Sequence, residues 1–354
     1  MMLAIRRFFR PLMVVALLAS SVLIAYANTG GTRDASTGLV SIAAQPSGGS
    51  GTWTNSAPMP IYRSEMPAVA LDGKIYVAGG LAGSTQNFKD VTTALHYYDT
   101  ATNTWHEAPP VPRRLHHFAM AALGGRIYIT GGYKDSDFDP DQTEVWVFYP
   151  HAKASAAWKR AADMPAPRAA HASVALNGLL YVIGGVTGNS TALWAYNPAS
   201  NTWNTKLAPM PTQREHLTAA AANGRIYVIA GRWLPSPGNM GTLEEYDPAS
   251  NTWAAKAGMP TPRSGLTSAV VNGKIHVTGG EDLSSSMTYN QHEVYDPATN
   301  TWATYPDMPT SRHGLASAAV NGKWYVIGGG LLAGGQTYAS LTNIVEVFTP
   351  SPAR

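Results

Sequence analysis

The stretch AVVNGKIHVTGG, residues 269–280, holds most of what decides the fold of this chain. Its Asn272-Gly273 pair accepts a positive φ at both positions and so predicts a two-residue hairpin turn between the apolar segments on either side. A glycine pair closes the second segment, and the arrangement returns at intervals of 46 to 53 residues. The pairs, one of them a variant, are Gly79-Gly80, Gly131-Gly132, Gly184-Gly185, Ala230-Gly231, Gly279-Gly280 and Gly328-Gly329. This regular return indicates six repeated structural units.

Two further landmarks recur in step with the glycine pairs. A turn of the type Tyr295-Asp296-Pro297 precedes most tryptophans, and a Met-Pro-x-x-Arg segment follows most of them. The tryptophans are Trp53, Trp105, Trp158, Trp203, Trp253 and Trp302. Proline fixes φ and Asp or Asn side chains bond nearby backbone, so these segments predict tight turns. Each unit therefore predicts four short antiparallel strands, with the glycine pair after the second strand and the tryptophan in the fourth.

With these glycine pairs, spaced tyrosines and tryptophans, and a leading arginine in each first strand, residues 51–350 resemble six kelch repeats. The resemblance implies an all-β fold, a six-bladed kelch β-propeller with four antiparallel strands per blade. Two copies depart from the pattern. Ala230 replaces a glycine, and the second copy has Pro109-Pro110 for Met-Pro and two additional residues between its arginine and Gly125. The blade connections are expected near 59–66, 109–117, 164–171, 210–217, 259–266 and 308–315.

The last repeat lacks its fourth strand, and the start of the repeat region has an extra strand of that type. The last unit stops after a third strand at residues 344–348, whereas residues 51–54 form a tryptophan strand with no unit before it. We therefore expect the N-terminal strand to close the last blade, which removes a free sheet edge.

Residues 1–27 have the features of an export signal. Three arginines precede an apolar run over residues 12–27, which ends in the cleavage motif Ala25-Tyr26-Ala27. This run of 16 residues is short for a membrane span of about 20. The prediction is an exported protein, periplasmic or extracellular, and an uncleaved N-terminal anchor is the alternative. Residues 28–50, rich in Gly, Ser and Thr, predict a flexible linker, and 351–354 form a short tail.

Charge and composition limit the function classes. The formal net charge is +3, and removal of the signal with its three arginines leaves a neutral chain. A neutral domain gives no support for nucleic-acid binding through counterion release. The chain has no cysteine, which excludes disulfides, thiol catalysis and thiolate metal sites. We expect a monomer with no membrane span once the signal is cleaved.

Connectivity predicts one functional face. In a four-stranded meander, the loops between strands 2 and 3 leave the blade on the same side as the blade connections, and the tight turns leave on the other side. The long segments all fall on the first side, at 81–93, 133–143, 232–241, 281–291 and 330–343. Function commonly lies on such loops. This loop face is therefore the predicted binding face.

A constant arginine begins the first strand of five units, ten residues before the turn glycine. These residues are Arg63, Arg168, Arg214, Arg263 and Arg312. A ring of guanidinium groups around a channel mouth suits carboxylates or sugar hydroxyls, which accept from forked donors. The alternative is a scaffold role, in which each arginine bonds carbonyls of neighbouring connections.

Residues that differ between copies are better ligand-site candidates, because a scaffold role would repeat. Those near the arginine position are Glu65, Arg113, Arg114, His116, His117, His171, Glu215, His216 and His313. Arg232 and Trp233 join them from a loop, where the indole offers a stacking platform for a sugar ring. Clustered His, Arg and Glu suit acid–base chemistry or ligand binding. For each histidine the alternative is a hydrogen bond to loop backbone, and for Trp233 it is loop packing.

An acidic run in the second unit is the one candidate metal site in the sequence. Its carboxylates, mostly at two-residue spacing, suit Ca²⁺, although Pro140 stands where an EF-hand loop needs glycine. A solvated acidic loop is the alternative, and no other cofactor is expected. The residues are Asp135, Asp137, Asp139, Asp141 and Glu144.

Two functions remain open. The first is a non-catalytic interaction scaffold for a glycan or protein ligand on the loop face, which is also what the resemblance to kelch proteins implies. The second is a carbohydrate enzyme similar to the N-acetylneuraminate epimerases, the sialic acid mutarotases, which share the export signal and the six-bladed kelch fold; no diagnostic motif of theirs maps onto this chain. Copper radical oxidases of galactose-oxidase type also share the propeller but need a Tyr–Cys cofactor, and the absence of cysteine excludes them.

Overall fold

The computed structural model divides the chain into two units, Met1–Gln45 and Pro46–Arg354. It describes residues 48–83, 88–136, 138, 142–186, 190–234 and 238–352. The predicted signal and most of the predicted linker therefore lie outside the described residues. The helices found within these ranges are the short 3₁₀ turns η1 (Ala154–Ala156) and η2 (Gly334–Ala339), and neither has the length that a bilayer crossing requires.

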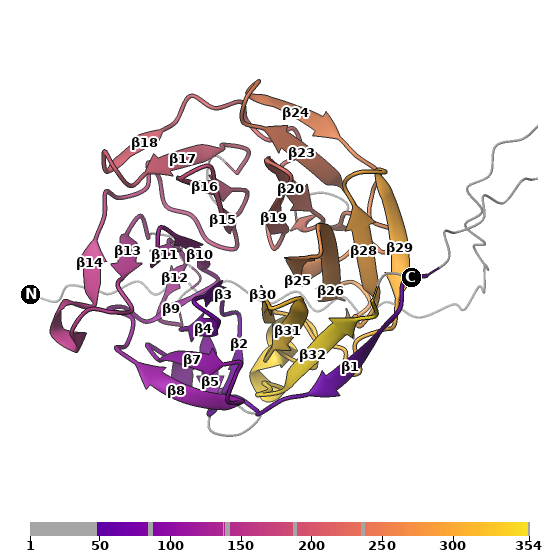
Figure 1. Cartoon of the computed structure of the whole chain (residues 1–354), viewed down its shortest axis with the longest axis horizontal. Coiled ribbons are helices and arrows are strands. Elements are labelled where there is room, and N and C mark those ends of the chain that lie inside the picture. Colours follow the sequence, from indigo (N-terminus) through magenta and orange to yellow (C-terminus); the bar gives the residue numbers. More distant parts are fainter. Residues whose placement is uncertain are drawn as a thin grey trace, which may run out of the picture. The chain divides into compact units, whose positions relative to one another are not determined.

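Six antiparallel sheets with four-stranded cores follow one another along the chain and stand around a common axis (Figure 1). The first three blades comprise β3 (Ala68–Leu71), β4 (Lys74–Ala78), β7 (Leu95–Asp99) and β8 (Thr104–Ala108); β10 (Ala119–Leu123), β11 (Arg126–Thr130), β13 (Val145–Phe148) and β14 (Trp158–Arg160); and β15 (Ala172–Leu176), β16 (Leu179–Ile183), β17 (Trp194–Asn197) and β18 (Thr202–Asn204). The last three comprise β19 (Thr218–Ala222), β20 (Arg225–Ile229), β23 (Leu243–Asp247) and β24 (Thr252–Ala255); β25 (Ser264–Val271), β26 (Lys274–Asp282), β28 (His292–Asp296) and β29 (Thr301–Tyr305); and β30 (Ala316–Val320), β31 (Lys323–Ile327), β32 (Val345–Pro350) and β1 (Gly51–Asn55). The prediction of a six-bladed propeller is confirmed.

The N-terminal strand closes the last blade, as predicted. β1 pairs antiparallel with β32, from Gly51 opposite Pro350 to Asn55 opposite Glu346. The indole N–H of Trp53 donates to the carbonyl of Pro306 at 2.7 Å and fastens the strand to the neighbouring connection. Strand β32 therefore has no free edge.

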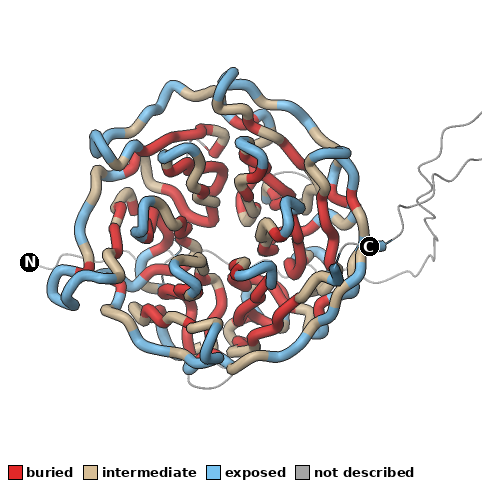
Figure 2. Tube along the Cα trace, viewed as in Figure 1, coloured by how far each residue is buried: buried red, intermediate tan, exposed pale blue. Residues whose placement is uncertain are grey.

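Burial is greatest in the middle of each blade. The second and third strands are mostly buried, the innermost strands such as β3 and β15 are partly buried, and the outermost strands are largely exposed (Figure 2). The recurrent tryptophans lie in the outer strands, where each indole N–H donates to a carbonyl of a blade connection, as Trp105 does to Ala57 at 2.8 Å and Trp302 to Ala257 at 2.7 Å. The tryptophans thus hold adjacent blades together.

The glycine pairs also join neighbouring blades. The second glycine donates its N–H to the carbonyl at the arginine position of the next blade, for example Gly132 to Arg168 at 2.8 Å. Both glycines have positive φ, and a Cβ on Gly131 would lie 2.1 Å from the Arg168 carbonyl oxygen. Only glycine fits such an approach without a backbone shift.

The same hydrogen bond corrects the predicted register of the second copy. Gly80 donates to the carbonyl of Leu115 at 2.8 Å, so Leu115 occupies the arginine position, ten residues before Gly125. No residues are inserted between the two. Arg113 and Arg114 precede that position and are not counterparts of the constant arginines.

Short strands gather on the loop face, because each blade connection pairs with the long loop of its own blade. β2 pairs with β5 and β9 with β12, while bridges such as Glu215–Arg232 and His313–Gly330 do the same elsewhere. This face therefore brings the connections and the long loops together, as the connectivity predicted. The short strands are β2 (Tyr62–Ser64), β5 (Leu81–Gly83), β6 (Asp90–Val91), β9 (Leu115–His116), β12 (Tyr133–Lys134), β21 (Arg232–Trp233), β22 (Gly238–Asn239) and β27 (Met287–Thr288).

Candidate functional site: a pocket on the propeller axis

The six blade connections meet at the axis in a closed circle of backbone hydrogen bonds. One residue from each connection, two positions after the arginine position, donates its N–H to the carbonyl of its counterpart in the neighbouring connection at 2.7–3.0 Å. This axial circle consists of Glu65, His117, Ala170, His216, Gly265 and Gly314. All six have left-handed φ values of 50–63°, a region that costs a residue with a Cβ about 1–2 kcal/mol. The circle fixes six backbone positions and leaves the residue type open.

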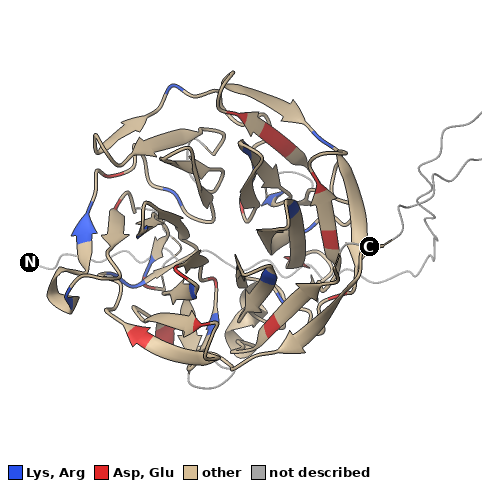
Figure 3. Ribbon diagram, viewed as in Figure 1, with Lys and Arg blue, Asp and Glu red and all other residues tan. Residues whose placement is uncertain are grey.

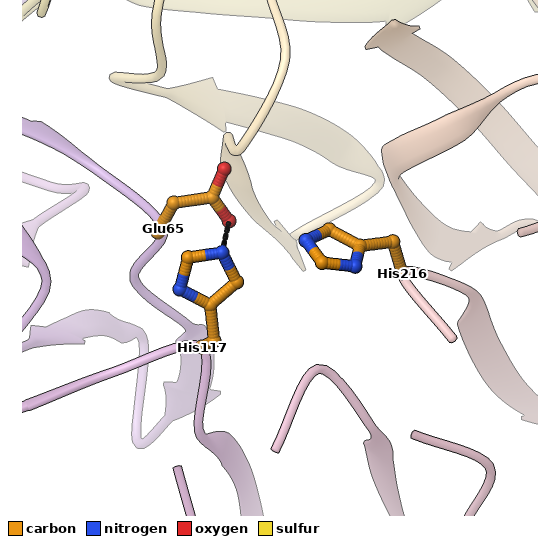
Figure 4. A group of neighbouring side chains, drawn as sticks. All are labelled: Glu65, His117 and His216. Carbon is orange, nitrogen blue, oxygen red and sulfur yellow. Dashed lines mark ion pairs between the residues drawn. The ribbon is translucent and has the colours of Figure 1, made fainter. Parts of the chain in front are cut away.

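Three members of the axial circle carry ionisable side chains that converge (Figure 4). Oε2 of Glu65 lies 3.2 Å from Nε2 of His117. The rings of His117 and His216 lie edge to face with their centroids 5.1 Å apart. Ala170 and the two glycines contribute no competing polar group. The three side chains therefore share the centre of the circle.

Two more sets of six residues surround the axial circle and pair with each other across the short strands. One set directly follows the arginine position: Ser64, His116, Ala169, Glu215, Ser264 and His313. The other directly follows the glycine pair: Leu81, Tyr133, Val186, Arg232, Glu281 and Gly330. Members of all three sets line a pocket of about 340 Å³ on the loop face.

Arg232 is the one guanidinium among the described residues that line this pocket, and two carboxylates hold it. It donates from Nε to Glu215 at 2.7 Å and from a terminal nitrogen to Glu281 at 2.5 Å. Glu215 also contacts Nδ1 of His216, and Glu281 lies 3.3 Å from Nε2 of His313. Burial raises the pKa of Glu281, but His313 and Arg232 outweigh it and hold that pKa below its usual range. Charged residues are sparse across the blades (Figure 3). The other buried Arg–Glu contacts are single pairs within one blade, such as Arg214 with Glu244, whereas this network links neighbouring blades.

Burial controls the protonation of the three ionisable members of the axial circle. It raises the pKa of Glu65 to about 7, and the charge of Glu281 adds to that shift. Burial also lowers the pKa of His117 to about 3, with Arg232 contributing. The same two causes hold the pKa of His216 well below its usual range. Both imidazoles are therefore neutral at physiological pH, and the carboxyl group of Glu65 ionises near pH 7.

An apolar rim surrounds the opening of the pocket. Tyr133, Phe138, Tyr338, Leu234 and Leu283 line it. Five large apolar side chains are exposed among the described residues, all in loops between second and third strands: Phe138 (54%), Leu234 (64%), Leu283 (38%), Met287 (54%) and Leu332 (45%). Exposed apolar groups gathered on one face mark an interaction surface.

The five constant arginines lie in the interior instead of the pocket. Each is at most 1% exposed and bonds backbone carbonyls. This burial favours their scaffold interpretation over ligand binding. Their side-chain partners are Glu244 for Arg214, Glu293 for Arg263, Glu346 for Arg312, His96 for Arg63 and the ring of Trp194 for Arg168.

Other predicted site residues also lie away from the pocket. Arg113 and Arg114 are half-exposed and pair with Glu144 and Asp90, respectively. Trp233 is partly buried in β21 and lies outside the pocket lining.

Two predicted histidines have hydrogen-bonding roles next to the circle. His171 bonds Oγ1 of Thr130 at 2.9 Å, beside a channel of about 200 Å³ that the innermost strands line. Nδ1 of His116 lies 2.6 Å from Nδ1 of His117 and orients that ring. The pocket itself therefore contains Glu65, His117, Glu215, His216, Arg232 and His313 of the predicted set.

Three of the candidate calcium ligands, Asp137, Asp139 and Asp141, fall outside the described residues. Glu144 pairs with Arg113 at 2.6 Å and with Arg160 at 2.5 Å. A hydrogen bond from Arg113 is the largest of the effects that lower the pKa of Glu144 to about 2. Glu144 is thus held by cationic side chains, and calcium binding by the rest of the run stays a prediction.

Glu281 and Tyr133 line the pocket but were not predicted as site residues. Both directly follow a glycine pair, the same place that Arg232 occupies in the fourth copy. Comparing this position across the six copies would have found them, since it varies as strongly as the positions after the arginine. Phe138 and Tyr338 come from long loops without a repeat register, and no sequence signal marks them.

The blades and their closure define a β-propeller, and the axial pocket with its apolar rim is the candidate binding site at its loop face. The model of the KLHDC2/KLHL20/DRC7 Kelch-repeats domain matches residues 30–185 and 116–329. The chain belongs to the kelch-repeat family. Kelch repeats in general serve as scaffolds for protein interactions.

Individual relatives agree with this assignment. The chain is 32% identical to Kelch-like protein terF of Aspergillus terreus, over 48% of this chain and 39% of that protein. It is 28% identical to the F-box/kelch-repeat protein SKIP4 of Arabidopsis thaliana, over 48% of this chain and 46% of that protein. The chain thus spans less than half the length of these curated relatives. The solved structure of YjhT is similar in fold, with a TM-score of 0.68 and 16% identity, over 83% of this chain and 97% of that chain.

Proposed function

We propose that this chain is an exported, non-catalytic binding protein whose loop face receives a segment of another protein in the axial pocket. The observation that carries the proposal is the apolar rim: all exposed large apolar side chains of the described residues lie on the loops of this face. Three of them, Phe138, Leu234 and Leu283, line the opening itself. The aliphatic Leu234 and Leu283 suit the apolar side chains of a protein segment, whereas the aromatic rings of the rim suit a protein segment or a sugar ring.

The pattern of the six copies supports the same proposal. The turn face repeats nearly the same tight turns, apart from the longer connection 149–157 of the second blade, whereas the loop face differs from blade to blade in length and residue type. A rigid propeller that presents variable loops resembles other scaffolds on which binding loops are displayed. With the predicted signal at residues 1–27, the partner would be a protein of the cell envelope or exterior, and the propeller would act as a monomer.

A library of displayed peptides tests the proposal. The full chain is screened beside the triple variant Phe138→Ser, Leu234→Ser, Leu283→Ser, whose exposed side chains can change without loss of the fold. We expect peptides that bind the parent and lose binding to the variant. The same two proteins on a glycan array provide the alternative outcome. Rim-dependent glycan binding without peptide binding would replace the protein ligand by a carbohydrate, and no rim-dependent binding in either screen would refute the proposal.

A sugar mutarotase is the second candidate, on the observation that Glu65 has a pKa raised to about 7 by burial. A general acid–base group works best when its pKa is near the working pH. The pocket is less suited to a carboxylated sugar, because Glu215 and Glu281 already neutralise Arg232. NMR of the anomer exchange of N-acetylneuraminate, with the parent and with Glu65→Gln, tests this activity. Faster exchange that Glu65→Gln abolishes would establish the enzyme and displace the binding proposal.

A further inference from the structure

We propose that Glu65, His117 and His216 of the axial circle bind a divalent transition-metal ion of the Zn²⁺ class. The inference goes beyond the binding function, since it concerns the floor of the pocket and does not require a partner at the rim. No cysteine and no acidic run contributes to it. The chemistry is that of two imidazole nitrogens and one carboxylate oxygen, a donor set common for Zn²⁺, Co²⁺ and related ions.

The geometry of the three side chains carries the proposal. One donor atom from each lies within 4.8 Å of the other two (Figure 4). Bonds of about 2.0–2.2 Å place the donors of one ion about 3–4 Å apart. Small side-chain rotations therefore suffice to bring all three donors to one ion.

The rings of both histidines are oriented by a second contact on Nδ1. Nδ1 of His216 contacts Glu215, which Arg232 holds at 2.7 Å, and Nδ1 of His117 lies 2.6 Å from Nδ1 of His116. Since Nδ1 is engaged in each ring, Nε2 is the atom left to face the ion. Metal-binding histidines generally make such a contact, often to a carboxylate, with the nitrogen that does not bind the metal.

Charge and protonation suit a cation at this place. A metal ion binds imidazoles in their neutral form and carboxylates in their ionised form. Among the described residues that line the pocket, the carboxylates of Glu65, Glu215 and Glu281 face the single guanidinium of Arg232. A divalent ion would offset this excess of acidic groups and would favour the ionised form of Glu65. The nitrogen donors select a transition metal over Ca²⁺ or Mg²⁺, which prefer all-oxygen sites.

The backbone of the axial circle gives an independent reason to assign a role to these side chains. Glu65, His117 and His216 hold left-handed φ values of 50–53°, whereas two other copies have glycine at the same position. Glycine would remove a cost of about 1–2 kcal/mol at each site. Residues kept in such a conformation cluster at functional sites. With three protein ligands the ion keeps an open position, and the pocket above the circle gives access to it.

Calorimetric titration of the metal-free full chain with ZnCl₂ tests the proposal. We expect one ion per chain, with an affinity that falls at acidic pH because protons compete with the ion for its ligands. Co²⁺ serves as a second probe, and its visible absorption should report four- or five-coordination. Absence of binding, or a Co²⁺ spectrum typical of six oxygen ligands, would overturn the assignment.

The other copies of the repeat supply variants that should fold. Glu65→Gly, His117→Gly and His216→Gly each reproduce the residue found at Gly265 and Gly314, and each should weaken Zn²⁺ binding by about 100-fold or more. Ala170→Gly changes the same circle without removing a donor and should leave the affinity unchanged. His151→Ala removes an exposed histidine away from the axis and controls for surface binding. Equal affinity in the parent and the three glycine variants, or a loss with His151→Ala, would refute the site.

Discussion

Two circles of residues, two positions apart along the same six connections, differ in nearly every property. At the arginine position five copies carry arginine and the second carries Leu115, and all six side chains are at most 3% exposed. At the axial circle the six copies carry four residue types, and three of the side chains line a pocket. The side chains of the first circle bond within their own blades, for example Arg214 to Glu244 and to the carbonyl of Val228. The second circle closes across all six blades through its backbone N–H and carbonyl groups. A position whose backbone makes the structural contact leaves its side chain free for binding.

The arginine position also shows how a scaffold residue depends on its partner. In the last three blades the arginine faces a glutamate, in the third blade Arg168 stacks on Trp194, and in the second blade Leu115 packs with Trp146. The partner therefore changes with the blade: it is a carboxylate in three blades, the Trp194 ring for Arg168, and His96 with backbone carbonyls for Arg63. At the axial circle the side-chain contacts, Glu65 with His117 and His216 with Glu215, occur in single copies and do not repeat around the circle.

The largest effect is expected from breaking a scaffold pair. Arg312→Ala leaves Glu346, which is 2% exposed, without its charge partner in the interior. Removal of one member of a buried pair costs about 3–5 kcal/mol. Urea unfolding of the variant beside the parent measures this loss.

The double variant Arg312→Leu, Glu346→Trp is the matched control, because it copies the apolar pair of the second blade. We expect it to recover most of the stability that Arg312→Ala loses. If the double variant lost as much unfolding free energy as Arg312→Ala, the ion pair itself would stabilise the blade and an apolar pair could not replace it. That result would contradict the view that the copies exchange equivalent pairs.

The axial circle should respond to pH in a way that the scaffold circle does not. The pKa of Glu65 rises from 4.5 to about 7 on burial, so between these values the folded protein holds a proton that the unfolded chain releases. The stability from Glu65 is present below pH 4.5, falls as the pH rises to about 7, and is constant above. Relative to Glu65→Gln, the parent should lose on the order of 3 kcal/mol over this range. Unfolding of both proteins with a chelator present measures the difference; a flat difference would contradict the burial of this carboxyl.

The sequence predicted the scaffold more completely than the site. Asn-Gly turns, glycine pairs and the separated tryptophan strand encode the blades and their closure locally, so they can be read along the chain. The register of the second copy was predicted wrongly, because valine and leucine replace the methionine and the arginine of the Met-Pro-x-x-Arg segment there. The backbone bonds of Val111 to Thr93 and of Gly80 to Leu115 show that Leu115 is the counterpart of the arginines. Within the site, Glu65, His117 and His216 were predicted because they differ between copies. Phe138 was missed, since only three-dimensional folding brings its loop over the axis.

Replacing a ligand of the axial circle by glycine should separate function from stability. His216→Gly removes a left-handed residue with a Cβ and also a contact with Glu215, and these effects oppose each other. We expect the unfolding free energy to change by less than about 1 kcal/mol, while Zn²⁺ binding is lost. Thermal unfolding in chelator, set beside the Zn²⁺ titration, checks both halves. If His216→Gly lowered the free energy of unfolding as much as Arg312→Ala, His216 would be a scaffold residue. The two circles would then not differ in this respect.

The smallest effects are expected where the axial circle has no ligand side chain, and they test the backbone argument directly. Ala170→Gly relieves a φ of 51°, whereas Gly265→Ala places a Cβ at a φ of 63°, with its nearest neighbours 3.6 Å away. Space is sufficient at Gly265, so conformation alone should set the sign: stabilisation by up to about 1 kcal/mol for Ala170→Gly and a similar loss for Gly265→Ala. Chemical denaturation resolves shifts of this size when the two variants are compared side by side. Shifts of the same sign would show that the left-handed φ does not determine the stability of these variants. The conformational cost assigned to Glu65, His117 and His216 would then be unsupported.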